Sequence, residues 1–265
     1  MRLKGKVCAI TGGGSGIGAV ASKLFASEGA MVYVLELNET TGKEVVESII
    51  ENGGKAAFVH CDVGCCNSVE RAFKQIELES GSLDVLYNNA SVFLGQKDGK
   101  ITDIQPETWE LILKINLNSI YYCCHFGIPL LQKSGGGSVI NTSSSAGVIG
   151  IPRCDAYTAA KGATVALTRS MASEYGPDGI RVNCIAPAAI ATDMVKESNP
   201  DGDDFDAFNF INLRTPLRRW GAPEEVAKLA LFLASDDSSY INGTVITADG
   251  GITINGDLAK SRTCS

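Results

Sequence analysis

The chain contains 265 residues, of which 45% are hydrophobic and 20% charged, and its formal net charge is −7 at pH 7. This length suits one large domain or two small ones, and this composition excludes a disordered or fibrous protein. An acidic chain lacks the basic footprint that nucleic-acid binding leaves, so we expect no nucleic-acid partner. No apolar run approaches the roughly 20 residues that span a bilayer, and the apolar stretch near the N-terminus is too short for a signal peptide. We therefore expect a cytoplasmic protein without a membrane partner.

Short β-like runs alternate with longer helical patterns along the chain. The predicted elements are, in chain order, strand 6–11, helix 17–28, strand 31–35, helix 40–52, strand 56–60, helix 68–79, strand 83–87, helix 107–131, strand 138–142, helix 156–175, strand 180–186, helix 224–234 and strand 244–247. Strands that are apolar throughout and separated by helices imply a parallel sheet covered on both faces. We predict an α/β fold in which one doubly wound, seven-stranded parallel sheet carries helices on both faces and residues 1–265 form a single domain.

One segment, residues 193–220, departs from this rhythm because it is long, polar and irregular. Its middle is acidic and contains Phe205, Phe208 and Phe210. A long insertion between a strand and the next helix often forms a lid over a site. We predict a substrate lid over these residues; the alternative is a solvated surface excursion.

The nine cysteines and two histidines show no spacing typical of a zinc site. An odd number of cysteines cannot pair completely within one chain, and adjacent cysteines rarely form disulfides. We therefore predict reduced thiols and no metal.

A glycine cluster, residues 11–18, follows the first strand and opens the first helix. A helix N-terminus offers free backbone N–H groups and a partial positive charge, and glycines allow a pyrophosphate to approach the backbone closely. A strand before such a turn and a helix after it are the context of a dinucleotide site. The residues that we assign to this site are Gly12, Ser15, Gly16, Ile17 and Gly18.

Glu36 ends the second strand and lies 18 residues beyond Gly18. A carboxylate there can accept hydrogen bonds from both hydroxyls of an adenosine ribose and would repel a 2′-phosphate. The next basic residue is Lys43, so we predict NAD as the cofactor instead of NADP. Asp62, after the third strand, is placed to hold the adenine amino group, although acids are common in turns. The alternative for Glu36 is a solvated carboxylate at a strand end.

From about residue 4 to residue 251 the chain resembles the short-chain dehydrogenase/reductase family. The motifs that carry the resemblance are Thr11-Gly12-x-x-x-Gly16-x-Gly18, Asn88-Asn89-Ala90, Asn116, Ser144 and Tyr157-x-x-x-Lys161. The resemblance implies a single-domain Rossmann fold and an NAD(H)-dependent enzyme that interconverts a secondary alcohol and a ketone. It assigns catalysis to Asn116, Ser144, Tyr157 and Lys161. It also assigns the following to the cofactor: Val63, Asn89, Tyr157, Lys161, Pro187, Ile190 and Thr192.

Ketone reduction needs a hydride donor, a proton donor and stabilisation of developing negative charge. Tyr157 and Lys161 stand four residues apart, on one face of a helix. A free phenol has a pKa near ~10, so an adjacent ammonium would help Tyr157 to exchange its proton near neutral pH. The resemblance implies that Lys161 also binds the nicotinamide ribose, that Ser144 holds the substrate oxygen and that Asn116 holds a water that relays the proton.

Several alternatives remain at these positions. Ser143 or Ser145 could take the part of Ser144, and Asn116 could serve only to stabilise its helix. Arg153 either touches a polar substrate or is solvated.

Two positions depart from the family's pattern. Ser91 stands where a glycine usually follows Asn-Asn-Ala, and Ala188 stands where a glycine usually follows Pro187. Neither change removes a chemical group, so we expect tuning of the activity and not its loss.

We therefore expect an oxidoreductase with Tyr157 as general acid/base and a small molecule as substrate, either a hydroxysteroid or a sugar or polyol. The alternative is a non-catalytic NAD(H)-binding sensor, although such a protein is expected to lack part of the Ser/Tyr/Lys set. An epimerase would need a larger C-terminal domain, and an enoyl reductase would need a wider Tyr-to-Lys spacing. The predicted helices 107–131 and 156–175 carry more apolar surface than one sheet face needs, and related enzymes pair these helices. We expect a homotetramer.

Overall fold

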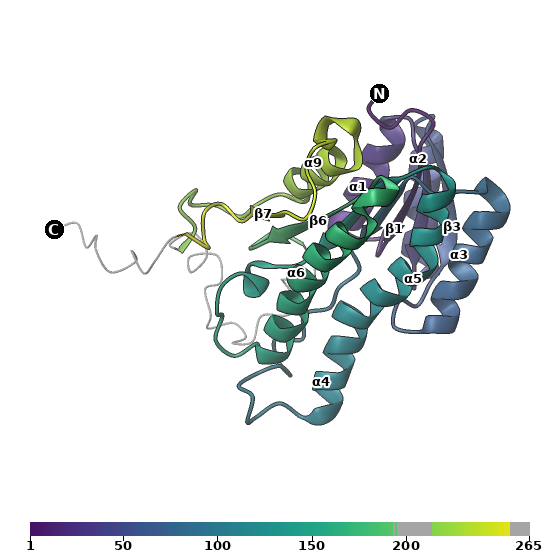
Figure 1. The fold of residues 1–265 in the computed structure, drawn as a ribbon. Helices are drawn as coiled ribbons and strands as arrows, with labels where there is room; N and C mark the ends of the chain where they lie inside the picture. The colour runs from purple at the N-terminus through teal and green to yellow at the C-terminus, as the bar shows by residue number, and fades with distance from the viewer. Residues whose placement is uncertain (193, 195–213, 255–265) are drawn as a thin grey trace.

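Seven parallel strands form one sheet in the computed structural model, which describes residues 1–192, 194 and 214–254. The strand order is β3-β2-β1-β4-β5-β6-β7, and each neighbouring pair is parallel (Figure 1). The strands are β1 Val7–Thr11, β2 Met31–Glu36, β3 Lys55–His60, β4 Val85–Asn88, β5 Gly137–Thr142, β6 Ile180–Pro187 and β7 Val245–Ala248. The predicted parallel sheet is confirmed, and the chain order reverses between β1 and β4. A crevice opens at the carboxyl ends of the strands at such a reversal.

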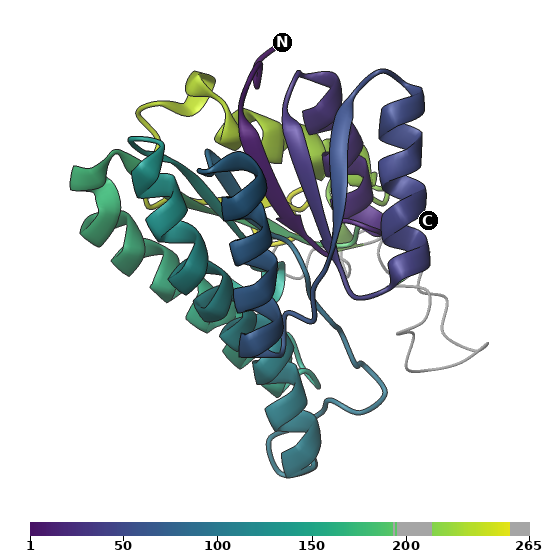
Figure 2. The same cartoon turned by 90° about the vertical axis from the view of Figure 1, so that its right-hand side faces the viewer.

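Helices cover both faces of the sheet (Figures 1 and 2). On one face α1, α2 and α9 pack around a cluster that includes Phe25 and Leu231. On the other face α3, α5 and α6 pack around a cluster that includes Phe73 and Ile128. The bounds are α1 Gly16–Ser27, α2 Glu39–Glu51, α3 Cys66–Ser80, α5 Ser119–Lys133, α6 Asp155–Tyr175 and α9 Pro223–Ala234. Each helix buries an apolar stripe, as the 3.6-residue periodicity predicts.

The predicted helix 107–131 is helical along its whole length but is not α-helical throughout. The structure instead has α4 (Pro106–Leu113), a π-helical turn η1 (Lys114–Asn118) and then α5. A π-helical turn inserts one extra residue into a helix while its hydrophobic pattern continues on either side, so the periodicity did not reveal it. Such turns are frequent at functional sites, and this one carries Asn116.

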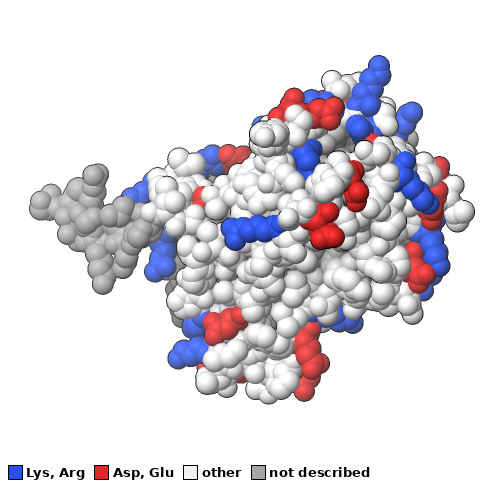
Figure 3. Space-filling model, in the orientation of Figure 1, with Lys and Arg blue, Asp and Glu red and all other residues white. Residues whose placement is uncertain are grey.

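The outer surface of α4, α5 and α6 carries few charged side chains (Figure 3). Leu111 and Tyr121 are exposed on α4 and α5. Ala159 and Ala166 are exposed on α6, which lies along α4 and η1. This sparsely charged surface is of the kind that another protein chain can cover.

The predicted lid, residues 193–220, falls largely outside the described residues. Met194 and residues 214–220 are described, and the rest of the lid prediction stays untested.

Candidate active site

The glycine turn joins the end of β1 to the start of α1. Gly12 has φ +61°, and a Cβ on Gly18 would lie 2.0 Å from the Gly12 carbonyl oxygen, so neither position accepts a side chain without strain. Within the described residues, Ser15 precedes α1 without a side-chain cap, and the first turn of α1 contains no acidic residue. The N-terminal N–H groups of α1 and their partial positive charge therefore face the crevice, as an anion site requires.

Asn89 connects this turn to the loop that follows β4. Its Nδ2 donates to the carbonyl oxygens of Thr11 at 3.1 Å and Gly12 at 3.3 Å, and its backbone N–H donates to Thr11 Oγ1 at 3.0 Å. These bonds hold the two loops together at the point where the strand order reverses.

Glu36 lies against the glycine turn at the end of β2. Its Oε2 accepts from the Gly14 N–H at 3.1 Å, and its Oε1 accepts from the N–H groups of Leu37 at 2.8 Å and Asn38 at 3.1 Å. Asp62 Oδ1 accepts from the Gly64 N–H at 2.9 Å in the turn after β3. The two carboxylates therefore follow neighbouring strands at the same edge of the sheet.

Tyr157 and Lys161 come from the first two turns of α6. Lys161 is buried, its Nζ donates to the Thr142 carbonyl oxygen at 3.0 Å, and Nζ lies 5.5 Å from the centre of the Tyr157 ring. Burial lowers the pKa of Lys161 to about 8, because the charged amine is poorly solvated there. The amine therefore remains mostly protonated at pH 7.

The phenol of Tyr157 is held among hydroxyl groups and an aromatic ring. Burial raises the pKa of Tyr157 above its ordinary value, while hydrogen bonding with the hydroxyls of Ser144 and Ser91 lowers it. The ring of Phe93 packs edge-on against that of Tyr157, with centroids 5.1 Å apart. The dominant influence is desolvation, so the phenol needs further positive charge to ionise near neutral pH.

Ser143 and Ser144, which follow β5, differ in their hydrogen bonds. Ser143 Oγ donates to the Lys161 carbonyl oxygen at 2.8 Å, which commits its hydrogen. Ser144 Oγ accepts from the Ala146 N–H at 3.2 Å, which leaves its own hydrogen for the cavity. Of the two, Ser144 is therefore the better donor to a ligand.

Asn116 is buried in the π-helical turn, and its side chain forms hydrogen bonds to the loop after β4. Its Nδ2 donates to the Val92 carbonyl oxygen at 2.9 Å, and its Oδ1 accepts from the Val92 N–H at 3.0 Å. Ser91 Oγ donates to the same Oδ1 at 2.6 Å. The sequence did not predict the bond from Ser91, since the two residues are 25 positions apart.

A cavity of about 680 Å³ opens between these elements. The predicted site residues that line it are Gly12, Ser15, Gly16, Ile17, Asn89, Ser144, Tyr157, Pro187, Ile190 and Thr192. The following predicted residues stand outside the set of described residues that line it: Gly18, Glu36, Asp62, Val63, Asn116 and Lys161. Lys161 and Asn116 lie buried behind the wall, whereas Glu36 and Asp62 lie further along the carboxyl edge of the sheet.

The rest of the cavity wall is largely apolar. Apart from Met194 and Trp220, which belong to the predicted lid segment 193–220, the sequence analysis did not identify it. Its apolar members are Phe93, Ala146, Ile149, Ile151, Pro152, Ala189, Met194, Trp220 and Ile252. They come from separate loops, and no local spacing relates one loop to another.

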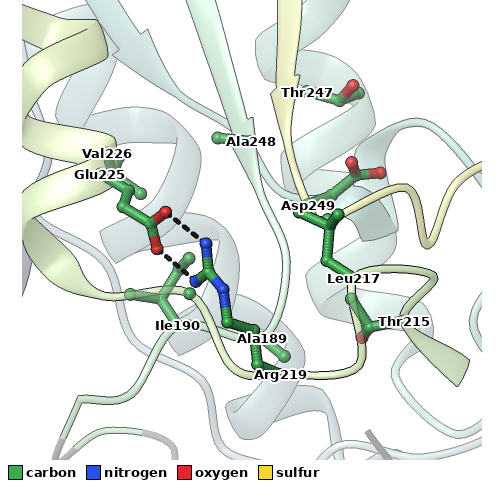
Figure 4. Close-up of a pocket in the computed structure, with 12 residues that line it drawn as sticks. Ala189, Ile190, Thr215, Leu217, Arg219, Glu225, Val226, Thr247, Ala248 and Asp249 are labelled. Carbon is green, nitrogen blue, oxygen red and sulfur yellow. Dashed lines mark hydrogen bonds and ion pairs between the residues drawn. The ribbon is translucent and has the colours of Figure 1, made fainter. Parts of the chain in front are cut away.

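Arg219, which precedes Trp220 in the chain, forms an ion pair with Glu225 (Figure 4). Arg219 Nη1 and Nη2 each lie 2.7 Å from an oxygen of Glu225, and Arg219 Nη1 also donates to the Trp220 carbonyl oxygen at 3.0 Å. The Arg219 guanidinium lowers the pKa of Glu225 to about 2, with help from the Ala222 N–H. The pair borders a smaller cavity of about 220 Å³.

The two departures from the family pattern fit the backbone. Of the described non-glycine residues, only Arg153 and Arg218 have positive φ, so neither Ser91 nor Ala188 occupies a conformation that requires glycine. Arg153 is exposed and is not among the described residues that line the main cavity.

Among residues 1–192, 194 and 214–254, no three His, Cys, Asp or Glu side chains are placed to share a metal ion. None of the described helices combines the length and the apolar character that crossing a bilayer demands.

Asp98, which is buried, caps the helix that carries Tyr157. Its Oδ2 accepts from the Tyr157 N–H at 2.9 Å and its Oδ1 from the Ala156 N–H at 3.2 Å. Among the described residues, Cys154 immediately precedes α6 and supplies no side-chain cap. A carboxylate from the loop after β4 therefore fixes the first turn of α6.

We predict that Asp98→Ala lowers the free energy of unfolding by about 1–2 kcal/mol, because it leaves buried helix N–H groups without an acceptor. Chemical denaturation followed by circular dichroism measures the change. The matched control is Asp103→Ala, an exposed acid of the same loop, which should stay within about 0.5 kcal/mol of the wild type. Equal stabilities of the two variants would contradict the cap.

The chain is similar to known proteins along nearly its whole length. A family model described as "Enoyl-(Acyl carrier protein) reductase" matches residues 12–253. The chain is 41% identical over 257 residues to an uncharacterized oxidoreductase, YxbG, of Bacillus subtilis (strain 168), with 95% of this chain and 92% of the relative covered. It is 35% identical over 252 residues to the cyclohexanol dehydrogenase of Acinetobacter sp. (strain SE19), with 95% and 96% covered. The crystal structure of levodione reductase superposes with a TM-score of 0.91 at 32% identity, with 96% of this chain and 100% of that chain covered.

Proposed function

Because the chain belongs to the short-chain dehydrogenase/reductase family, a family of oxidoreductases that act on alcohol or keto groups, we propose that it interconverts a secondary alcohol and a ketone by NAD(H)-dependent hydride transfer. The observation that carries this proposal is the arrangement around Tyr157. Its phenol faces Ser144 in the wall of the main cavity, and the amine of Lys161 lies buried behind it.

The residues present fit a nicotinamide dinucleotide. The uncapped N-terminus of α1 is suited to a pyrophosphate, and Gly16, at φ +49°, brings the backbone to the cavity wall without a side chain. Ser15 and Ile17 would hold the phosphates, while Pro187, Ile190 and Thr192 would hold the nicotinamide end. When bound, this cofactor supplies or accepts the hydride.

Tyr157 is the proposed general acid/base. In the direction of reduction its phenol donates a proton to the ketone oxygen, which Ser144 holds through its free hydroxyl hydrogen. In the direction of oxidation the phenolate removes the alcohol proton. The charge of Lys161 favours the phenolate, and Asn116, fixed to Val92 by two hydrogen bonds, organises the buried wall behind the pair.

The apolar wall favours an apolar substrate. Phe93, Ile149 and Ile151 surround the space beside Tyr157, which suits an alicyclic alcohol or ketone, a hydroxysteroid included, better than a sugar or polyol. Cyclohexanol dehydrogenase and levodione reductase are named for such ring compounds. The description of the matching family model names an enoyl reductase. Only three residues separate Tyr157 from Lys161, and this spacing is shorter than the one we expect in an enoyl reductase.

The alternative of a non-catalytic sensor has less support, because Ser144, Tyr157 and Lys161 are all present and adjacent. Turnover of any carbonyl or alcohol by the purified protein decides against it.

We predict that Tyr157→Phe lowers kcat for the oxidation of cyclohexanol with NAD⁺ by about 10²–10⁴-fold, because it deletes only the proton-transfer group. The Kd for NADH, measured by fluorescence titration, should stay close to that of the wild type. Tyr175→Phe, at the far end of the same helix, is the matched control and should retain activity. A Tyr157→Phe enzyme that keeps more than about a tenth of kcat would exclude Tyr157 as acid/base.

Cofactor choice rests on Glu36 in this proposal. The carboxylate lies on the glycine turn, 3.1 Å from the Gly14 N–H, where a ribose diol can donate to it and a 2′-phosphate meets like charge. Leu37 is 59% exposed, so it can be changed without loss of core packing.

We predict that the wild type prefers NAD by about a hundredfold in kcat/KM and that Glu36→Ala loses most of this preference, since hydrogen bonds to a charged group contribute roughly 1.5–3 kcal/mol each. Full reversal requires the further change Leu37→Arg, because removal of a repulsion supplies no phosphate ligand. Steady-state kinetics with both cofactors measure the ratios. Glu47→Ala, which removes an exposed acid from α2, is the control. If the ratio of kcat/KM for NAD to kcat/KM for NADP is unchanged in Glu36→Ala, Glu36 is only a solvated carboxylate at a strand end.

The surface of α4, α5 and α6 suits a second copy of the chain. Ala159, Ala166 and Ser170 are small and exposed on α6, and Tyr121 is 58% exposed on α5. Small residues allow helices to approach closely, and an exposed tyrosine adds contact area. A homotetramer, as the family resemblance implies, would bury this surface.

We predict a tetrameric mass in sedimentation at micromolar protein and a lower mass for Ala166→Glu, which inserts a charge into this surface. Ile50→Glu makes the same kind of change at an exposed position of α2 and should leave the mass unchanged. A monomeric wild type would refute the proposal.

A further inference from the structure

We propose that Ser91 is a further catalytic residue: its hydroxyl, which bonds to Asn116 beside the cavity that Tyr157 also lines, donates a hydrogen bond to the phenolate that forms when Tyr157 releases its proton. This inference rests on the proposed role of Tyr157 as acid/base. It concerns the one position of the Asn88-Asn89-Ala90 loop where this chain departs from the family's usual glycine.

The direction of the resting hydrogen bond follows from Asn116. Its amide orientation is fixed, because Nδ2 donates to the Val92 carbonyl oxygen at 2.9 Å and Oδ1 accepts from the Val92 N–H at 3.0 Å. Oδ1 can only accept, so Ser91 Oγ, 2.6 Å away, must donate its single hydrogen to it. In this state Ser91 Oγ can accept a hydrogen bond from the phenol but cannot donate one to it.

Ser91 also shares the cavity wall with the reacting phenol. Ser91, Ser144 and Tyr157 line the same cavity, and both serine hydroxyls act on the phenol as hydrogen-bond partners that lower its pKa. A neutral phenol can donate to Ser91 Oγ while Ser91 donates to Asn116. A phenolate needs donors, and rotation about the Cβ–Oγ bond of Ser91 turns its hydrogen from Asn116 to the phenolate.

The proton balance leaves Ser91 unchanged. In ketone reduction the phenolic proton moves to the oxygen of the reduced substrate, and the O–H bond of Ser91 stays intact throughout. Asn116 Oδ1 keeps its bond from the Val92 N–H when Ser91 turns away, so no buried acceptor is left without a donor. Ser144 can then keep its own hydrogen on the substrate oxygen during the whole step, because Ser91 serves the phenolate.

The site allows the hydroxyl to be removed cleanly. Position 91 is not among the described non-glycine residues with positive φ, so alanine fits its backbone without strain. Asn116 retains both bonds to Val92 in a Ser91→Ala variant. Ser91→Thr keeps a hydroxyl at the same position and is the conservative variant.

The direct test is the ionisation of Tyr157 in the full-length protein. Carbon-13 NMR of protein labelled at the tyrosine ζ carbon, with NAD⁺ or NADP⁺ present according to which binds more tightly, follows each phenol during a pH titration. The signal that is missing from Tyr157→Phe identifies Tyr157. We expect its pKa to rise by about one unit in Ser91→Ala and to stay near the wild-type value in Ser91→Thr, since one hydrogen bond to a charged group is lost in the first variant only.

The kinetic test uses cyclohexanol as probe. Because oxidation requires the phenolate, a pKa higher by about one unit lowers kcat near neutral pH about tenfold and moves the acidic limb of the pH profile by the same amount. Ser91→Thr should restore both. A Ser91→Ala protein whose Tyr157 titrates as in the wild type would overturn the role of Ser91 and leave Tyr157 as acid/base. Wild-type turnover by Tyr157→Phe would instead overturn the proposed function, and the role of Ser91 with it.

Discussion

The hydrogen bonds from Asn89 to the backbone of Thr11 and Gly12 hold the site together. In a doubly wound sheet the helices after β1 and β4 leave the strands on opposite faces, so the loops at these strand ends diverge and open a crevice. An open crevice alone has no fixed shape. Asn89 donates across it and sets the distance between the N-terminus of α1 and the loop after β4, on which the cavity wall depends.

That loop then organises α6 as well as the glycine turn. Within ten residues it supplies Asn89 to the glycine turn, Ser91 to Asn116, Phe93 to the ring of Tyr157 and Asp98 to the first turn of α6. A loop that is already held by four contacts loses little further conformational entropy when a ligand binds. The π-helical turn at Asn116 belongs to this arrangement, because it brings a buried amide to the backbone of the loop.

Burial and charge act in opposite directions at the centre of the site. Desolvation raises the pKa of Tyr157 and lowers that of Lys161, so each group is pushed toward its neutral form. Hydrogen bonding with the hydroxyls of Ser144 and Ser91 opposes this at Tyr157 by favouring the phenolate, and in the proposed mechanism the ammonium of Lys161 acts in the same direction. Acid/base chemistry at neutral pH requires such a balance. A phenol that is desolvated without compensation would not ionise near neutral pH, and a fully solvated phenol would keep its ordinary pKa, well above neutral pH.

The sequence by itself determined the parallel sheet, the glycine turn before α1 and the pairing of Tyr157 with Lys161. These features depend on local periodicity, on turn chemistry and on a four-residue helical spacing, all of which are legible within a short window. Only the tertiary structure decided the π-helical turn, the cap of α6 by Asp98, the bond from Ser91 to Asn116 and the apolar wall beside Tyr157. The π-helical turn leaves the hydrophobic pattern on either side of it unchanged. Each of the other three features joins residues from separate segments. Their contacts are set by how the helices pack on the sheet, and no pattern along the chain encodes the distance between two loops that meet only in the fold.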